Sequence, residues 1–203
     1  MSRYTGSVNR KSRRLGFSIL ENNKEFLKGK KRTYAPGQHG QANRKLSGYG
    51  EQLAEKQKLA YMYGVTDRQF RRIFTFAKKM KGSNALNLLI ALESRLDNLV
   101  YRMGFAPTRR SSRQLVTHGH VLVNGKKMDI PSTFIQPKSI ISIKEKSRKL
   151  PLINREEKVG TLAFVKVDNA NFSGEYLRYP ERPELNQDIN ETYVVEWYNR
   201  LVK

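Results

Sequence analysis

The 203-residue chain contains no cysteine, one tryptophan and only 18 acidic residues against 39 basic ones. The lack of cysteine excludes disulfides, thiolate metal sites and cysteine nucleophiles, and it is compatible with a reducing compartment. No segment approaches the ~20 apolar residues that a helix needs to span a bilayer, and residues 1–14 lack the apolar core of a signal peptide. We therefore expect a soluble intracellular protein.

Positive charge dominates what is present, but it is unevenly distributed. The formal net charge is +21 and the isoelectric point is near 10.3. Counted by segment, the net charge is +10 over residues 1–45, +5 over 46–92, +8 over 93–173 and −2 over 174–203. Such a balance points to a polyanionic partner, most often nucleic acid. The slightly acidic tail is expected to face something else.

The stretch 92–125 carries the clearest structural pattern. Apolar residues at helical spacing predict one helix that begins at Leu92 and ends at Gly104. Thr108 is a suitable N-cap for a second helix, which Gly119 would close. The dipeptide Asn124-Gly125, which follows two alternating valines, predicts a tight hairpin.

Three arginines, Arg109, Arg110 and Arg113, fall in the first turns of that second helix. Each cation there opposes the helix dipole at a cost of roughly 0.3–1 kcal/mol, and two cations at i,i+4 spacing repel each other. A bound phosphate would reverse both effects, because amides and guanidinium groups together bind anions. The alternative is a solvated charged face. If these arginines serve only to bind anions, replacing Arg109 and Arg113 with alanine should not lower the stability of the isolated protein.

The rest of the chain suggests an α+β protein. Residues 1–45 are read as an extended basic arm, and 46–91 as a helical domain with helices near 51–63 and 66–82. Thr66 and Gln69 form a capping-box pattern at the start of the second of these helices. Residues 92–173 form a module with an antiparallel sheet, whose further strands are expected near 126–128, 140–143 and 162–167. Residues 174–203 should complete the helical domain, ending in a helix, although their β-branched and aromatic content also suits a strand.

Several motifs resemble the bacterial small-subunit ribosomal protein S-four family in the same order along the chain. They are SRYTG at 2–6, APGQHG at 35–40, LSGYGEQLAEKQK at 46–58, YGVTDRQFRR at 63–72, RLDNLVYRMGFAPTRRSSRQLVTHGHVLVNG at 95–125 and PERPELNQDINETYVVEWY at 180–198. The resemblance implies a fold with a helical domain, a small RNA-binding α/β module and a basic arm.

In function, the resemblance implies a structural component of the small ribosomal subunit that acts without catalysis. It would bind a multi-helix junction in the 5′ domain of the small-subunit rRNA early in assembly. It would also lie near the path of incoming mRNA, contact the neighbouring ribosomal protein S-five, support translational accuracy and possess the capacity to repress its own message. No cofactor, metal, small-molecule substrate or membrane is implied, and the location would be the cytoplasmic ribosome.

The residues assigned to these roles come from charge and from this resemblance. The predicted RNA-binding residues are Arg3, Arg10, Lys11, Arg13, Arg14, Arg44, Lys45, Arg68, Arg71, Arg72, Arg109, Arg110, Arg113, His118 and Lys126, with Arg44 and Lys45 nearest the mRNA. The predicted protein-interface residues are Glu181, Glu184 and Trp197. Many relatives bind zinc through cysteines in the arm, a site that this cysteine-free chain lacks. Tyr4, Tyr34 and Tyr49 suit either base stacking or internal packing.

Three other functions compete with this interpretation. An enzyme with the same RNA-binding module, such as a pseudouridine synthase or a tyrosyl-tRNA synthetase, would need a catalytic domain for which few residues remain. A free RNA-binding regulator would act away from the ribosome. Binding to an anionic membrane would need an amphipathic helix with a large exposed apolar face, which the sequence lacks.

Overall fold

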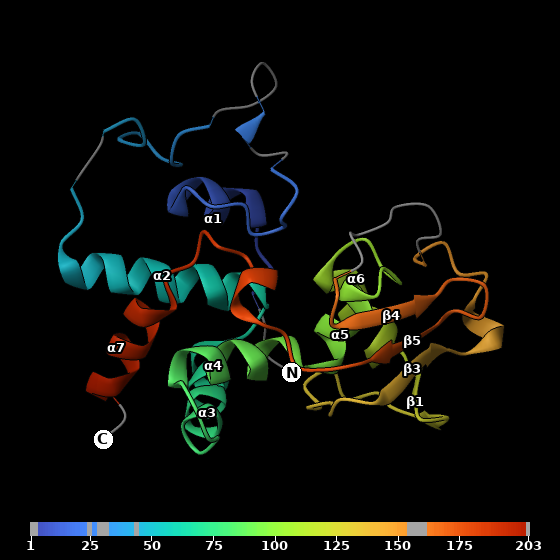
Figure 1. The fold of residues 1–203 in the computed structure, drawn as a ribbon. Coiled ribbons are helices and arrows are strands. Elements are labelled where there is room, and N and C mark those ends of the chain that lie inside the picture. Colours follow the sequence, from blue (N-terminus) through green and yellow to red (C-terminus); the bar gives the residue numbers. More distant parts are fainter. Residues whose placement is uncertain (1–3, 24–25, 28–32, 43–44, 154–161, 202–203) are drawn as a thin grey trace. The chain divides into compact units, whose positions relative to one another are not determined.

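The computed structural model describes residues 4–23, 26–27, 33–42, 45–153 and 162–201 (Figure 1). The chain divides into two compact units. Unit 1 comprises Met1–Asn87 and Asn186–Lys203, and unit 2 comprises Leu88–Leu185. Helix α4 (Asn84–Glu93) leads from the first unit into the second. These bounds lie about four and twelve residues from the predicted domain limits at 91 and 173, which stay a prediction.

Unit 1 is a helical unit built from α1 (Val8–Leu15), α2 (Gly48–Met62), α3 (Asp67–Lys78) and α7 (Glu191–Leu201). Its core is aromatic, since the rings of Phe70 and Phe74 on α3 stack on Tyr198 of α7 at 5.3 and 5.1 Å between centroids. The predicted capping pair at the start of α3 is confirmed, because Thr66 N–H donates to Gln69 Oε1 at 3.2 Å. The C-terminal segment is a helix, as predicted, and packs on α2.

The basic arm is not extended throughout. Residues Val8–Leu15 form helix α1, which lies against α2 (Figure 1). Phe17 and Ile19 follow it and are 5% and 2% exposed. Ser12 is also buried, and its Oγ accepts the Ile19 N–H at 3.3 Å. Sequence reasoning missed this helix because its two apolar anchors come after it, so its eight residues show almost no apolar periodicity.

Unit 2 combines α5 (Leu96–Arg102) and α6 (Arg109–Thr117) with a five-stranded antiparallel sheet. The strands are β1 (Val121–Val123), β2 (Lys126–Lys127), β3 (Ser139–Ile143), β4 (Val165–Asp168) and β5 (Ser173–Tyr176), in the order β2-β1-β3-β5-β4. The α+β fold class predicted from the sequence is thus confirmed. So is the hairpin, whose turn residues Asn124 and Gly125 both have positive φ, at 48° and 77°.

One strand of this sheet was not predicted. Strand β5 has the sequence SGEY, which shows no apolar alternation, yet it lies between β3 and β4 and pairs with both. Close packing explains why position 174 of this strand is a glycine. A Cβ atom at this position would lie 2.8 Å from Sδ of Met103, so the end of α5 packs directly on the strand backbone.

The prediction of a single helix that begins at Leu92 is wrong, because the helix is interrupted between α4 and α5. Arg95 is extended (φ −72°, ψ 142°) and forms a β-bridge with Phe134. The amides of Leu96 and Asp97 donate to carbonyls of the 131–133 segment, at 2.9 and 3.1 Å. A tertiary partner therefore takes the amides that a continuous helix would have used. The apolar stripe is nevertheless buried as predicted.

The break places a charged side chain in the core. Glu93, the last residue of α4, is 0% exposed. Arg102 holds it through two hydrogen bonds, from Nε to Oε2 at 3.0 Å and from Nη2 to Oε1 at 2.7 Å. Asn98 Nδ2 adds a third. This paired geometry is what allows a carboxylate to be buried.

Replacing Arg102 with alanine should therefore strongly destabilise unit 2. Removing one partner leaves an uncompensated buried charge, which costs about 3–5 kcal/mol. Amide hydrogen exchange of α5 measures the effect, since the only tryptophan lies in unit 1 and does not report on unit 2. Lys126→Ala, at an exposed residue of β2, is the control and should change stability by less than about 0.5 kcal/mol. Equal effects of both substitutions would show that the pair is not stabilising.

Candidate nucleic-acid interface

The three arginines at the start of α6 do not share one environment. Thr108 caps the helix as predicted, with its Oγ1 accepting the Ser111 N–H at 3.1 Å. Arg110 is exposed, whereas Arg109 is half-buried and Arg113 is only 7% exposed. All three side chains were expected to be available to an anion, but of the three only Arg110 is fully exposed.

Arg113 has a structural partner inside the unit. It donates from Nη1 to Oδ2 of Asp97 at 3.3 Å. The same carboxylate accepts two hydrogen bonds from Arg95, at 3.1 and 2.7 Å, and all three side chains are buried. Asp97 thus joins the start of α5 to the second turn of α6. The expectation that the fold does not need Arg113 is overturned by this contact.

Arg109 is positioned by the other buried carboxylate, through one intermediate residue. Its Nε donates to Oδ1 of Asn98 at 2.8 Å, and Asn98 in turn donates to Glu93. The Arg109 guanidinium lies over the Tyr101 ring at 4.6 Å from its centroid. A continuous polar chain therefore runs from the core to a half-buried guanidinium, which is held in a fixed orientation.

The far end of α6 and the adjoining hairpin carry the remaining predicted residues of unit 2. His118 and Lys126 are exposed. His120 is half-buried and its Nδ1 lies 2.9 Å from Ser147 Oγ. Burial lowers the pKa of His120, and the nearby His118 and Lys144 lower it further. His120 is consequently biased to the neutral form, in which it adds no charge to this surface.

Helix α3 exposes a basic face in unit 1. Arg68, Arg71 and Arg72 are all exposed, as predicted. Arg71 lies 3.6 Å from Asp67, but Arg68 and Arg72 make no hydrogen bond or ion pair within the described residues. They stand at i,i+4 spacing, so their charges repel unless an anion lies between them.

Asp67 is engaged elsewhere and does not neutralise this face. A hydrogen bond from Lys56 at 2.7 Å lowers the pKa of its carboxyl, an effect that partial burial opposes and that Tyr198 and Arg71 reinforce. Its charge is thus largely matched by Lys56. The α3 face keeps a net positive charge.

Phe76 on the same helix is a candidate that the sequence analysis missed. Its side chain is 46% exposed and follows Arg72 by four residues, on the face opposite the buried stripe of Phe70, Phe74 and Ala77. Position 76 lies outside the i, i+3, i+4 pattern of that stripe, and this spacing could have predicted from the sequence that the ring is exposed. An exposed ring beside cations is suited to stacking on a nucleic-acid base.

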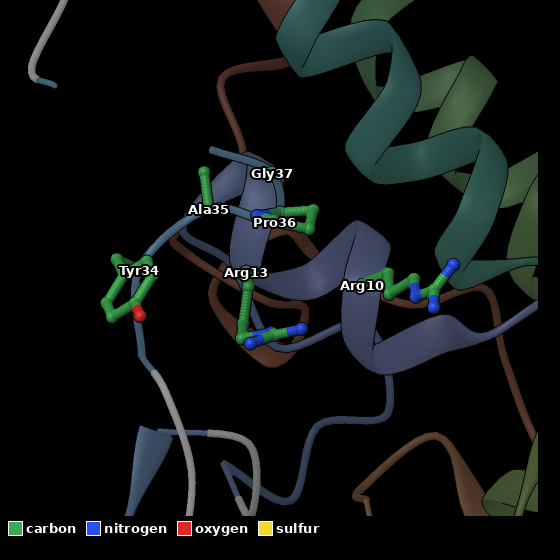
Figure 2. Close-up of a pocket in the computed structure, with 6 residues that line it drawn as sticks. All are labelled: Arg10, Arg13, Tyr34, Ala35, Pro36 and Gly37. Carbon is green, nitrogen blue, oxygen red and sulfur yellow. The ribbon is translucent and has the colours of Figure 1, made fainter. Parts of the chain in front are cut away.

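The described cations of the arm lie on and after α1. Lys11 is held between two aromatic rings, with its Nζ 5.4 Å from the centroid of Tyr4 and 5.1 Å from that of Tyr61. Arg14 and Lys45 are exposed. Arg10 and Arg13 line a cavity together with residues 34–37 (Figure 2). Arg3 and Arg44 lie outside the described residues.

The predicted protein-interface residues have different surroundings. Glu184 accepts two hydrogen bonds from Arg178, at 3.0 and 2.6 Å, so its charge is matched internally. Glu181 is exposed and lies 3.5 Å from the same arginine. Trp197 is 8% exposed and packs against Tyr49 at 4.7 Å between ring centroids. Tyr49 is itself 59% exposed, which extends the apolar surface outward from the tryptophan.

The described ranges contain neither a membrane-spanning helix nor a cluster of metal ligands. None of the helices there is both long and apolar enough to cross a membrane. Among those same residues there is also no group of three or more histidine and acidic side chains that could hold a metal ion.

Comparison with known proteins gives a consistent result along the whole chain. Residues 3–93 match the family model of the ribosomal protein S4/S9 N-terminal domain, and residues 94–141 match that of the S4 domain. The small ribosomal subunit protein uS4 of Malacoplasma penetrans is 61% identical over 202 residues, which covers 100% of both chains. Those of Mycoplasmoides gallisepticum and Mycoplasma pneumoniae are 60% and 57% identical, over 100% and 99% of this chain.

The contrast between Arg113 and Arg110 generates a test. Arg113→Ala should destabilise unit 2 by about 1.5–3 kcal/mol, because a hydrogen bond to a buried charge is lost. Arg110→Ala, three residues earlier on the same helix, should stay within about 0.5 kcal/mol of the unchanged protein. Amide hydrogen exchange of α6 compares the two. If Arg113→Ala were as stable as Arg110→Ala, the ion pair with Asp97 would have no structural role.

Proposed function

Because the chain belongs to the family of small ribosomal subunit protein uS4, as its motifs indicated, we propose that it is an rRNA-binding structural component of that subunit. In finer terms, it is a primary binder of a multi-helix junction in the 5′ domain of the rRNA and it nucleates assembly there. The observation that carries the proposal is the agreement of full-length similarity with the exposed Arg68 and Arg72, which have no carboxylate partner among the described residues.

The mechanism is recognition of shape by cations at fixed spacing. A-form RNA hides its major-groove base edges, so phosphates, 2′-hydroxyl groups and junction geometry are the accessible targets. Helix α3 supplies rigidly spaced guanidinium groups, and α6 supplies Arg110 beside the oriented Arg109. Because the buried network fixes Arg109 before RNA binds, less side-chain entropy is lost on association.

The arm extends this contact toward single-stranded RNA. Arg44 and Lys45, just before α2, are proposed to lie near the path of incoming mRNA. Lys45 is exposed, and Arg44 lies outside the described residues. Arg14 on α1 is also exposed, which supports a contact between the arm and the RNA backbone.

A second surface is proposed to contact the neighbouring ribosomal protein S-five and to influence decoding accuracy. The tail differs in charge from the rest of the chain, with a net charge of −2 over residues 174–203. The exposed ring of Tyr49 packs on Trp197 and forms an apolar patch with it, which suits a protein partner. Glu181 is the more available of the two predicted glutamates, because Glu184 is engaged by Arg178. A patch of this type would be buried in the assembled subunit.

Two alternatives remain distinct from this proposal. The relatives are named as ribosomal proteins, which disfavours an enzyme built on the same module. A free RNA-binding regulator would use the same cationic faces, and repression of the protein's own message would be a second use of the same RNA-binding surface.

Co-sedimentation separates a ribosomal component from a free regulator. The proposal expects one copy of the chain per small subunit after washing in high salt. The control is Arg178→Ala, which removes a cation already paired with Glu184 and should leave the stoichiometry unchanged. Recovery of the unchanged chain only in the ribosome-free fraction would exclude the structural role.

Salt dependence tests the electrostatic mechanism. For single-stranded and duplex nucleic acids, log K falls against log salt with a slope of about −0.7 to −0.9 per neutralised phosphate. The double substitution Arg68→Ala and Arg72→Ala should therefore make the slope of rRNA binding shallower by about 1.4–1.8. Filter binding across a salt series measures it, with Arg178→Ala again as the control. A slope unchanged by the double substitution would mean that the α3 face does not contact phosphates.

A further inference from the structure

A cavity of about 390 Å³ lies in unit 1 between α1 and the turn that follows Tyr34. Its lining residues are Arg10, Arg13, Tyr34, Ala35, Pro36 and Gly37, and none of them is acidic. The volume lies within the range of small-ligand pockets, roughly 300–1,000 Å³. Figure 2 shows the two arginines projecting from the helix and the other four residues following one another along the facing segment.

The wall opposite α1 is a defined turn. Gly37 has φ +111°, which residues with a side chain rarely adopt. A Cβ atom on Gly40 would lie 1.8 Å from the carbonyl oxygen of Ala35, so only glycine allows the chain to close here. The Gly40 N–H donates to Gly37 O at 3.3 Å. Backbone geometry thus holds Tyr34 and Pro36 at the edge of the cavity.

Tyr34 differs from the other two tyrosines that the sequence offered as stacking residues. Tyr4 packs edge-on against Tyr61 at 5.3 Å, and Tyr49 packs against Trp197 at 4.7 Å. Tyr34 makes no hydrogen bond or ring contact within the described part of the chain. Packing therefore accounts for Tyr4 and Tyr49 but not for Tyr34, a half-buried ring beside a cavity.

One of the two cations that line the cavity also has no internal partner in the described part of the chain. Arg10 makes no hydrogen bond or ion pair with any described residue. It stands at i,i+3 spacing from Arg13, so the two cations repel each other. Helix α1 contains no acidic residue that would offset them. An anion bound between or beside these guanidinium groups would convert the repulsion into attraction.

We propose that this cavity receives one unstacked nucleotide of the bound rRNA, an inference that rests on the proposed function. The base stacks on the ring of Tyr34, and Arg13 and Arg10 hold the phosphates on either side of it. In the view of Figure 2 the guanidinium of Arg10 extends away from Tyr34, and Arg13 lies between Arg10 and Tyr34. In this arrangement the two arginines bind two successive phosphates of one strand.

Such a nucleotide would also connect two parts of the arm. Its phosphates would bind a helix at residues 8–15, and its base would bind a turn at 34–40. Because stacking accepts any base, the site would select an unpaired position in the RNA rather than a particular letter.

Substitution of Tyr34 provides the main test, in the full-length chain with the 5′-domain rRNA at fixed salt. Base–aromatic stacking predicts that Tyr34→Ala weakens binding roughly 5- to 150-fold. Tyr34→Phe keeps the ring and should stay within about 2-fold, since only the hydroxyl is lost. Tyr49→Ala is the matched control, a tyrosine of the same unit that is used in packing. Equal affinities of Tyr34→Ala and Tyr49→Ala would overturn the inference.

Two further measurements keep the outcome decisive. If Tyr34→Ala loses its fold in thermal unfolding, Arg10→Gln replaces it and should make the salt slope shallower by about 0.7–0.9. Photocrosslinking of rRNA that carries 4-thiouridine should label Tyr34. Labelling by 4-thiouridine monophosphate alone, without labelling by rRNA, would assign the cavity to a free nucleotide and overturn the inference.

Different experimental results would contradict this inference and the proposed function. Tyr34→Ala with unchanged rRNA affinity, in a chain that still co-sediments with the small subunit, removes only the nucleotide pocket. Absence of the unchanged chain from the small subunit removes the proposed function itself.

Discussion

Two buried carboxylates, Glu93 and Asp97, position four of the five arginines in the α4–α6 region. Glu93 is matched by Arg102, and Asp97 by Arg95 and Arg113. A buried charge without a partner would cost several kcal/mol, so these arginines are committed to the fold. Arg110, by contrast, is exposed. The same residue type thus serves as core and as surface within one short helix.

The periodic features of the fold were predictable from the sequence. The capping pair at Thr66, the N-cap at Thr108 and the hairpin at Asn124 each depend on neighbouring residues and were confirmed. The break before Leu96 and strand β5 depend on partners far along the chain, namely residues 131–133 and the neighbouring strands. Such contacts override local periodicity, which a pattern within ten residues cannot reveal.

The candidate site shows a similar division. Charge and motifs identified the basic residues of α3 and the arm, but they could not tell a paired cation from an unpaired one. For Arg113 a signal existed, because Arg109, Ser112, Arg113 and the apolar Val116 share one helical face. For Tyr34 none existed, since three tyrosines looked equivalent until the ring contacts of Tyr4 and Tyr49 were seen.

Unit 1 is discontinuous in sequence, and this has a consequence for synthesis of the chain. Residues leave the ribosome in order, so all of unit 2 is made before α7 exists. Phe70 and Phe74 therefore wait for Tyr198, more than a hundred residues away, before their stacked core can form. A chain that is terminated early would expose these rings to chaperones and proteases. Formation of the aromatic core of unit 1 therefore depends on synthesis of α7.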